Sequence, residues 1–115
     1  MTDRPDLSLF PPSAAIDGDD LRIAGVSLRD LAREFGTPAY VIDEDGLRAR
    51  ARAYVAAFTS RHPRSRVCFA VKAFPSASVL RVLVEEGLGC DVVGAGELRI
   101  ALAAGADPAP TRRRS

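Results

Sequence analysis

Lysine and arginine together number 16 in this chain, and only one of the 16, Lys72, is a lysine. It follows the apolar run from Val67 to Val71, a pattern typical of a buried strand. Arginine provides the solubility and ion pairs of a surface lysine, but its guanidinium stays protonated and cannot act as a nucleophilic amine. The end of a strand beside a βα loop is where α/β folds place their chemistry, and partial burial there would favour a Schiff base. The alternative is that Lys72 is a chance survivor of arginine-rich codon usage.

Length and composition describe an ordinary globular protein of at most one domain. Of the 115 residues, 47% are hydrophobic and 27% are charged, with a net charge of +1. This balance predicts no nucleic-acid partner, and no apolar stretch approaches the roughly 18 residues that would span a membrane. The N-terminus lacks the basic start and apolar core of a secretory signal. Because Cys68 and Cys90 fall in expected strands, where cysteine behaves as a small apolar residue, we expect a reduced, cytoplasmic protein.

The first part of the chain is expected to be a loop followed by one strand and one helix. Residues 1–20 carry three prolines and a Gly-Asp-Asp cluster, which is typical of a flexible arm. Residues 21–26 could form a short strand. The apolar residues that follow recur at helical spacing between a capping Ser27 and a terminating Gly36: Leu28, Leu31, Ala32 and Phe35.

From residue 39 onward, expected strands and helices alternate. Strands are expected at 39–42, 67–71 and 90–93, and helices at 44–60, from Ser76 or Ser78 up to 87–89, and at 97–104. This order is typical of a parallel sheet with crossover helices, which occurs both in open doubly wound sheets and in closed barrels. The run 94–96 lacks the third glycine of a dinucleotide fingerprint and the lysine of a phosphate-binding loop. We therefore expect the chain to bind neither a dinucleotide nor a nucleoside triphosphate.

Three blocks in a fixed order carry a resemblance to a known family. They run from Phe35 to Asp43, from Phe69 to Phe74 and from Gly89 to Leu98. The second block contains Ala-Val-Lys-Ala, and the third begins its acidic motif 19 residues after the lysine. Over about residues 20–108 the chain resembles the pyridoxal-phosphate-dependent ornithine, diaminopimelate and arginine decarboxylases of the alanine-racemase fold, and most closely their diaminopimelate group.

The resemblance implies an α/β fold, namely about three βα units from the N-terminal portion of a TIM-type (β/α)8 barrel. It also implies a domain organisation: a flexible arm over residues 1–20, a partial barrel that binds pyridoxal phosphate over 21–108, and a non-family tail over 109–115. A complete barrel needs about 250 residues. We therefore expect a truncated product or an N-terminal fragment that is poorly folded and inactive by itself. Apolar side chains such as Val41, Phe69 and Val92 should remain partly exposed to solvent.

Roles for three residues follow from the resemblance. Lys72 would be the catalytic lysine that holds the cofactor, pyridoxal 5'-phosphate. Asp91 would lie beside the cofactor at the next strand, although it could equally cap a strand end. Glu97 would support the hydrogen bonds of the site, although the helix dipole alone favours a carboxylate in a first turn. No metal site is implied, and neither His62 nor either cysteine matches a family motif.

The implied reaction is decarboxylation of a small-molecule amino acid, with meso-diaminopimelate giving L-lysine and CO2 as the first expectation. An ornithine or arginine decarboxylase and an amino-acid racemase on the same barrel remain alternatives. The full-length family is homodimeric, and the resemblance leaves the state of this chain open. A different class of alternative is a small non-catalytic α/β protein that binds a partner or a pyridoxal species, with its sheet edges covered by self-association.

Overall fold

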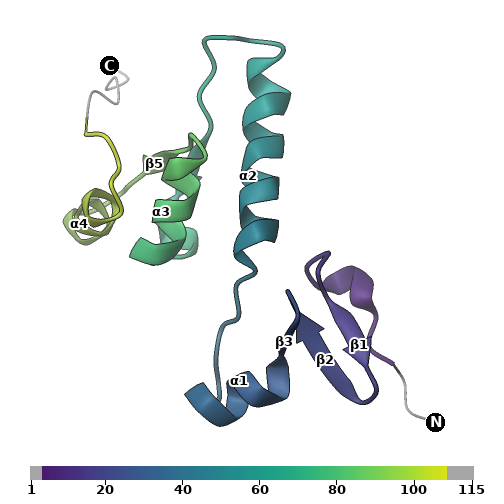
Figure 1. Ribbon diagram of the computed structural model, residues 1–115. Helices are drawn as coiled ribbons and strands as arrows, with labels where there is room; N and C mark the ends of the chain where they lie inside the picture. Colours follow the sequence, from purple (N-terminus) through teal and green to yellow (C-terminus); the bar gives the residue numbers. More distant parts are fainter. Residues whose placement is uncertain (1–3, 109–115) are drawn as a thin grey trace. The chain divides into compact units, whose positions relative to one another are not determined.

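Five short strands and four α-helices make up the chain in a computed structural model that describes residues 4–108 (Figure 1). They divide into two units, Met1–Gly46 and Leu47–Ser115, and each unit is described by itself. Residues 109–115, expected to be a non-family tail, lie outside the described part of the chain. Within residues 4–108 no helix has the length and apolar character needed to cross a membrane, and both cysteines are free thiols.

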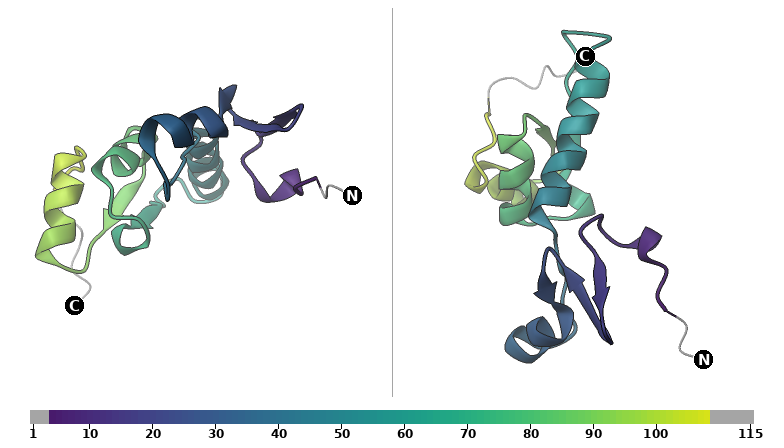
Figure 2. Two further views of the ribbon diagram at one scale, coloured as in Figure 1. Left: turned by 90° about the horizontal axis from the view of Figure 1, so that it is seen from below. Right: turned by 45° about the vertical axis from the view of Figure 1, so that its right-hand side comes forward.

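The first unit opens with an antiparallel meander, seen from two further sides in Figure 2. After the short helix η1 (Leu7–Leu9), strand β1 (Ala15–Asp17) pairs with β2 (Asp20–Ile23), which pairs with β3 (Val26–Ser27). The expectation of a loop throughout 1–20 is therefore wrong, and the expected strand over 21–26 is two strands. Both reversals are two-residue turns that use positive φ, at Gly18 (65°) and at Ala24 and Gly25 (50° and 78°), the backbone that tight hairpins require.

Helix α1 (Leu28–Phe35) follows the meander and confirms the expected helix. The Ser27 hydroxyl accepts a hydrogen bond from the Asp30 backbone N–H at 3.2 Å and so caps the first turn. At the other end Gly36 adopts φ 80°, and its N–H donates to the Ala32 carbonyl at 2.9 Å. The local signals in the sequence placed both helix ends.

The strand expected at 39–42 is absent from the described structure. These residues have no strand partner, and Tyr40 and Ile42 are 87% and 50% exposed. An apolar β-branched pattern favours an extended backbone, but a strand also needs a neighbour that satisfies its peptide groups. The sequence pattern gives the first condition and says nothing of the second.

Asp43 caps the long helix α2 (Glu44–Thr59), which confirms the helix expected over 44–60. Its carboxylate accepts from the Gly46 N–H at 3.2 Å and from the Ser13 hydroxyl at 2.6 Å, and the residue is only 8% exposed. The hydrogen bond from Ser13 and then that from Gly46 lower the pKa of Asp43. The start of α2 is thereby tied to the loop that precedes the meander.

The second unit is built around two parallel strands. Strand β4 (Cys68–Ala70) continues into the 3-10 turn η2 (Val71–Ala73) and helix α3 (Ala77–Glu85), and strand β5 (Gly89–Asp91) leads into helix α4 (Ala95–Ala103). The register pairs Cys68 with Gly89 and Ala70 with Asp91. The α/β character is confirmed, but the sheet has two parallel strands where three were expected. The strands are also shorter than expected, because residue 71 turns away in η2 and residues 92–93 leave the pairing.

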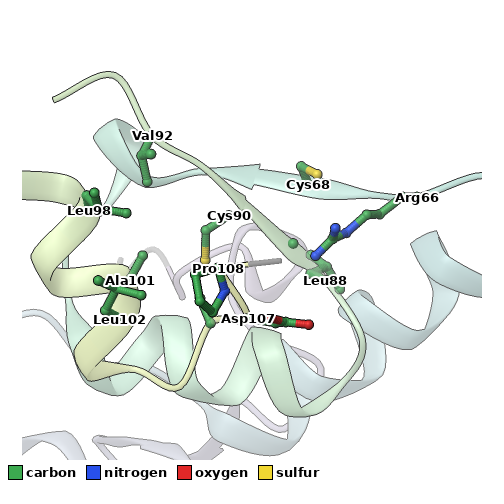
Figure 3. Close-up of a pocket in the computed structure, with 12 residues that line it drawn as sticks. Arg66, Cys68, Leu88, Cys90, Val92, Leu98, Ala101, Leu102, Asp107 and Pro108 are labelled. Atoms are coloured by element: carbon green, nitrogen blue, oxygen red, sulfur yellow. The ribbon is translucent and has the colours of Figure 1, made fainter. Parts of the chain in front are cut away.

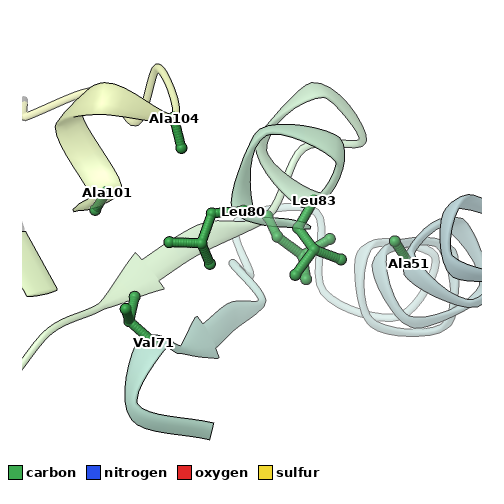
Figure 4. Packing of buried hydrophobic residues seen from close by; sticks show 7 residues of the cluster. Ala51, Val71, Leu80, Leu83, Ala101 and Ala104 are labelled. Atoms are coloured by element: carbon green, nitrogen blue, oxygen red, sulfur yellow. The ribbon is translucent and has the colours of Figure 1, made fainter. Parts of the chain in front are cut away.

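The core of the second unit lies on one face of these strands (Figure 4). Because strand residues alternate between faces, Phe69 and Cys90 point to the buried cluster while Cys68 and Asp91 stand on the other, exposed face. Helices α2, α3 and α4 all contribute to this cluster, whose buried members are Ala51, Val71, Leu80, Leu83, Leu88, Ala101 and Ala104. As expected, Val41 is 38% exposed, and Phe69 and Val92 are only partly buried. The sequence led us to expect a poorly folded chain, whereas this cluster leads us to expect a second unit that folds cooperatively with modest stability.

Helices α2 and α3 of this unit are joined by a cluster of ion pairs. Arg48 contacts Glu85 at 2.7 Å and Glu86 at 3.0 Å, and Arg52 holds both oxygens of Glu86 at 2.6 and 2.8 Å. The Glu86 side chain is 12% exposed, against 51% for Glu85. Hydrogen bonds from Arg52 and then from Arg48 hold the pKa of Glu86 below its ordinary value of 4.5.

The presence of this cluster should make the chain sensitive to acid. Because the folded chain depresses the pKa of Glu86, its contribution is complete above the ordinary pKa of 4.5 and is lost as pH falls through the folded value. The urea midpoint of the helical circular-dichroism signal should therefore fall on acidification, and Glu86→Gln should have a lower midpoint at neutral pH with a flatter pH dependence. Glu85→Gln, which removes one exposed contact, is the matched control and should change the midpoint little. Equal pH profiles for Glu86→Gln and the unsubstituted chain would contradict the assignment.

Candidate functional site

The carboxyl ends of β4 and β5 meet at one edge of the second unit. Since the two strands are parallel and Ala70 pairs with Asp91, the chain leaves both strands at the same level. Lys72 lies two residues after Ala70, and Glu97 lies in the first turn of α4, the helix that follows β5. All three residues singled out in the sequence thus belong to the carboxyl end of this sheet, where α/β folds bind their ligands.

Lys72 is held by a short turn and points away from the core. Its neighbour Val71 is 0% exposed, whereas Lys72 is exposed, and the turn closes with the Phe74 N–H donating to the Val71 carbonyl at 3.1 Å. Within residues 4–108 the Lys72 amine has no salt-bridge or hydrogen-bond partner. The partial burial expected for this lysine is therefore wrong in this structure. The reason is that the strand ends at Ala70, before the lysine, and the 3-10 turn carries it out of the sheet.

Asp91 is the last residue of β5, and its carboxylate is exposed on the face opposite the core cluster. It shares that face with Ala70, its partner across the strands. No salt bridge or side-chain hydrogen bond engages Asp91 within the described part of the chain. A capping role at the strand end would need a hydrogen bond to the Asp91 carboxylate, and the described residues provide none. The carboxylate is therefore available to a ligand at the carboxyl end of the sheet.

Glu97 has a local structural partner. Its Oε2 accepts a hydrogen bond from the Val93 backbone N–H at 2.9 Å, so the side chain reaches back across the N-terminus of α4, whose first flanking residue is Gly94. This resembles a capping box, in which a glutamate in the first turn satisfies a free N–H before the helix. The contact fixes the loop that joins β5 to α4, and one carboxylate oxygen remains for other partners.

A cavity of about 610 Å³ opens beside β5, and none of these three residues lines it. Its lining, drawn in Figure 3, includes Leu88 and Val92, which flank β5, Leu102 of α4, and the charged residues Arg66 and Asp107. Sequence reasoning missed it, because the block from Gly89 to Leu98 supplies only part of the lining, and the rest comes from Arg66, Cys68 and the chain after α4. Burial raises the pKa of the Cys90 thiol in its wall, which favours the thiol over the reactive thiolate.

Gly89, in the same wall, cannot be replaced without movement. A Cβ there would lie 2.8 Å from Arg66 Nε and 2.9 Å from Cys68 Sγ. The Arg66 side chain therefore crosses β5 where the glycine leaves room, on the face that carries Cys68 and Asp91. Replacement of Gly89 therefore requires the Arg66 and Cys68 side chains to move.

Comparison with known proteins identifies the family. Residues 45–111 match the family model described as pyridoxal-dependent decarboxylase, pyridoxal binding domain, which is more than half of the chain. The chain belongs to the pyridoxal-dependent decarboxylases. The matched residues include the whole carboxyl end of the sheet with Lys72, Asp91 and Glu97.

Individual members of this family are similar over most of the chain. It is 43% identical over 100 residues to diaminopimelate decarboxylase of Methanothermobacter thermautotrophicus, covering 87% of this chain and 23% of that protein. It is 49% identical over 86 residues to diaminopimelate decarboxylase of Mycobacterium tuberculosis, covering 75% of this chain and 19% of that protein. The crystal structure of diaminopimelate decarboxylase from M. jannaschii in complex with L-lysine matches with a TM-score of 0.71 at 27% identity, over 84% of this chain and 23% of that one.

The chain therefore spans about a fifth to a quarter of the length of the relatives that it matches, from 19% to 24%. Its described structure corresponds to the N-terminal part of diaminopimelate decarboxylase structures. The cofactor of the family is pyridoxal phosphate. The residues at the carboxyl end of the sheet fit that group in their chemistry: the single lysine side chain presents an exposed amine without a partner within residues 4–108, and the exposed carboxylate of Asp91 ends the neighbouring strand.

Proposed function

We propose that this chain is the lysine-bearing part of a pyridoxal-phosphate-dependent diaminopimelate decarboxylase, which converts meso-diaminopimelate into L-lysine and CO2. The observation that carries the proposal is the placement of Lys72: the only lysine, exposed, in the turn that directly follows a parallel strand. The identities of 43% and 49% with named diaminopimelate decarboxylases support the substrate. The L-lysine bound to the M. jannaschii enzyme is the product of the proposed reaction.

In this proposal Lys72 attaches the cofactor covalently through its amine. Bound pyridoxal phosphate supplies an electron sink for the carbanion left by loss of CO2. Asp91 places a negative charge at the carboxyl end of the same sheet, where it would favour the protonated form of a basic nitrogen of the bound cofactor. Glu97 holds the loop after β5 through the Val93 N–H and so keeps the wall of the site in place. Residues 21–108 would then be the first βα units of a TIM-type barrel.

The proposal is tested with a chimera in which residues 1–108 replace the matching segment of the M. tuberculosis relative. The purified chimera should release CO2 from meso-diaminopimelate faster than from ornithine or arginine, and the same chimera with Lys72→Arg should release none. The 115-residue chain alone is expected to be inactive, because it corresponds to about a quarter of its relatives. A chimera that prefers ornithine or arginine would overturn the substrate, and an active Lys72→Arg chimera would overturn the role of the lysine.

A further inference from the structure

The segment that carries Lys72 is bracketed by the two most completely buried large side chains of the described structure. Val71 and Leu80 are both 0% exposed, and no other large side chain in residues 4–108 is buried to that degree. Val71 immediately precedes the lysine, and Leu80 lies in α3. Both belong to the same cluster, together with Ala101 of α4 (Figure 4). The chain around the lysine is thus attached to the core at both ends.

Backbone hydrogen bonds leave this short segment little freedom between its two attachments. The Phe74 N–H donates to the Val71 carbonyl at 3.1 Å, the Ser76 N–H to the Phe74 carbonyl at 2.9 Å, and the Leu80 N–H to the Ser76 carbonyl at 2.9 Å. These bonds lead from the turn into the first turn of α3 without a gap. In a 3-10 turn of three residues, the direction of one side chain sets the direction of the next. With Val71 directed into the core, Lys72 is directed out of it.

We propose that Val71 is a positioning residue, which fixes the direction of the Lys72 amine toward pyridoxal phosphate by anchoring the η2 turn in the core. The proposal rests on the cofactor-bearing role proposed for Lys72. Its physical basis is that a lysine side chain has four rotatable bonds, so the backbone is the part of the residue that the fold can hold in place. A small displacement of a reacting group has a large effect on rate when the partner is held in a fixed position.

The alternative is that Val71 only fills volume in a small core and has no effect on the direction of Lys72. The two roles predict different effects on Lys72 when another side chain of the same cluster is shortened to alanine. Leu83 is 4% exposed, belongs to the same cluster and lies in α3, but it is not adjacent to the turn. If Val71 only fills space, Leu83→Ala should affect Lys72 at least as much as Val71→Ala, because it removes a larger side chain. If Val71 positions the lysine, Val71→Ala should have the larger effect.

The single lysine makes the turn directly visible by magnetic resonance. A chain labelled with nitrogen-15 only in lysine gives one backbone amide signal, that of Lys72. In the unsubstituted chain this signal should differ from its position in urea. In Val71→Ala the signal of the folded molecules should move toward the urea position. In Leu83→Ala, which also destabilises the core, the signal of the folded molecules should stay near its native position. Val71→Ile, which keeps an apolar β-branched side chain, should leave the signal close to that of the unsubstituted chain.

The second measurement follows attachment of the cofactor. The same four sequences, each built into the chimera described above, are treated with pyridoxal phosphate, reduced with borohydride at timed intervals and mapped by mass spectrometry. With the cofactor held by the rest of the chimera, labelling of Lys72 should be slower in Val71→Ala by about tenfold, and changed little in Leu83→Ala and Val71→Ile. The N-terminal amine, labelled in every sample, provides the internal reference rate.

Three results would overturn the proposal: a native lysine signal that coincides with the urea signal, equal shifts in Val71→Ala and Leu83→Ala, or equal labelling rates in those two variants of a chimera that labels Lys72 faster when folded than in urea. Failure of the proposed function gives a different pattern. The unsubstituted chain would then show the native lysine signal and its dependence on Val71, while Lys72 of the chimera would be labelled no faster in the folded protein than in urea.

Discussion

Replacement of Lys72 by arginine should abolish covalent attachment of pyridoxal phosphate to every side chain of this protein. Arginine keeps the positive charge and most of the length, but its guanidinium stays protonated and provides no nucleophilic amine. The chain has no other lysine, so only the N-terminal amine remains in the variant. Borohydride reduction followed by peptide mapping should therefore find the label on the Lys72 peptide of the unsubstituted chain and on no internal peptide of Lys72→Arg.

A matched control separates the position of Lys72 from the mere presence of an amine. Arg99 is an exposed residue of α4, and Arg99→Lys introduces a second side-chain amine on the same unit. If the turn after β4 favours attachment, the label should accumulate on Lys72 before it appears at position 99. Equal labelling of the two positions in the folded chain, or no difference between folded and urea-treated protein, would show that the placement of Lys72 contributes nothing.

The parts of the fold that the sequence predicted correctly are those fixed by neighbouring residues. Ser27 and Gly36 bound α1, and Asp43 caps α2, because a cap needs only a short polar side chain or a positive φ within one turn of the helix. The strand expected at 39–42 was wrong because strand formation depends on a partner from elsewhere in the chain. The two hairpins at Gly18 and at Ala24–Gly25 were missed because strands of two to four residues leave too few alternating positions to form a pattern.

In the candidate site, too, the sequence mainly predicted what depends on neighbouring residues and missed what depends on distant ones. Lys72 was identified because its residue type is unique in the chain and its strand is apolar. Its exposure was not anticipated, because the sequence does not show that β4 ends at Ala70 and turns at Val71. The contact of Glu97 with the Val93 N–H was not predicted, although the sequence placed Glu97 in the first turn of a helix, where such a contact forms. The Arg48–Glu86 pair joins residues 38 apart, and no short-range pattern in the sequence predicts it.

Truncation of Leu80 should remove most of the folded second unit. The side chain is 0% exposed within a cluster of seven buried residues, three of which are alanines. Leucine-to-alanine changes at such sites cost about 3 to 5 kcal/mol, while the total stability of a domain of this size is typically about 5 kcal/mol. In Leu80→Ala we expect the far-ultraviolet circular-dichroism signal to change with urea without a cooperative transition. The Lys72 amide signal should lie at the position that it has in urea.

Leu102→Ala is the control for this prediction, because it removes the same atoms from a residue of α4 that is 45% exposed. It should keep a cooperative transition, with a loss of stability of about 1 kcal/mol or less. The two variants separate loss of the core from loss of apolar surface in general. Because Leu80 closes the segment that begins at Val71, its loss should release the lysine even where part of the helical signal survives. Coincident urea transitions for Leu80→Ala and Leu102→Ala would show that the cluster around Leu80 does not hold this unit together.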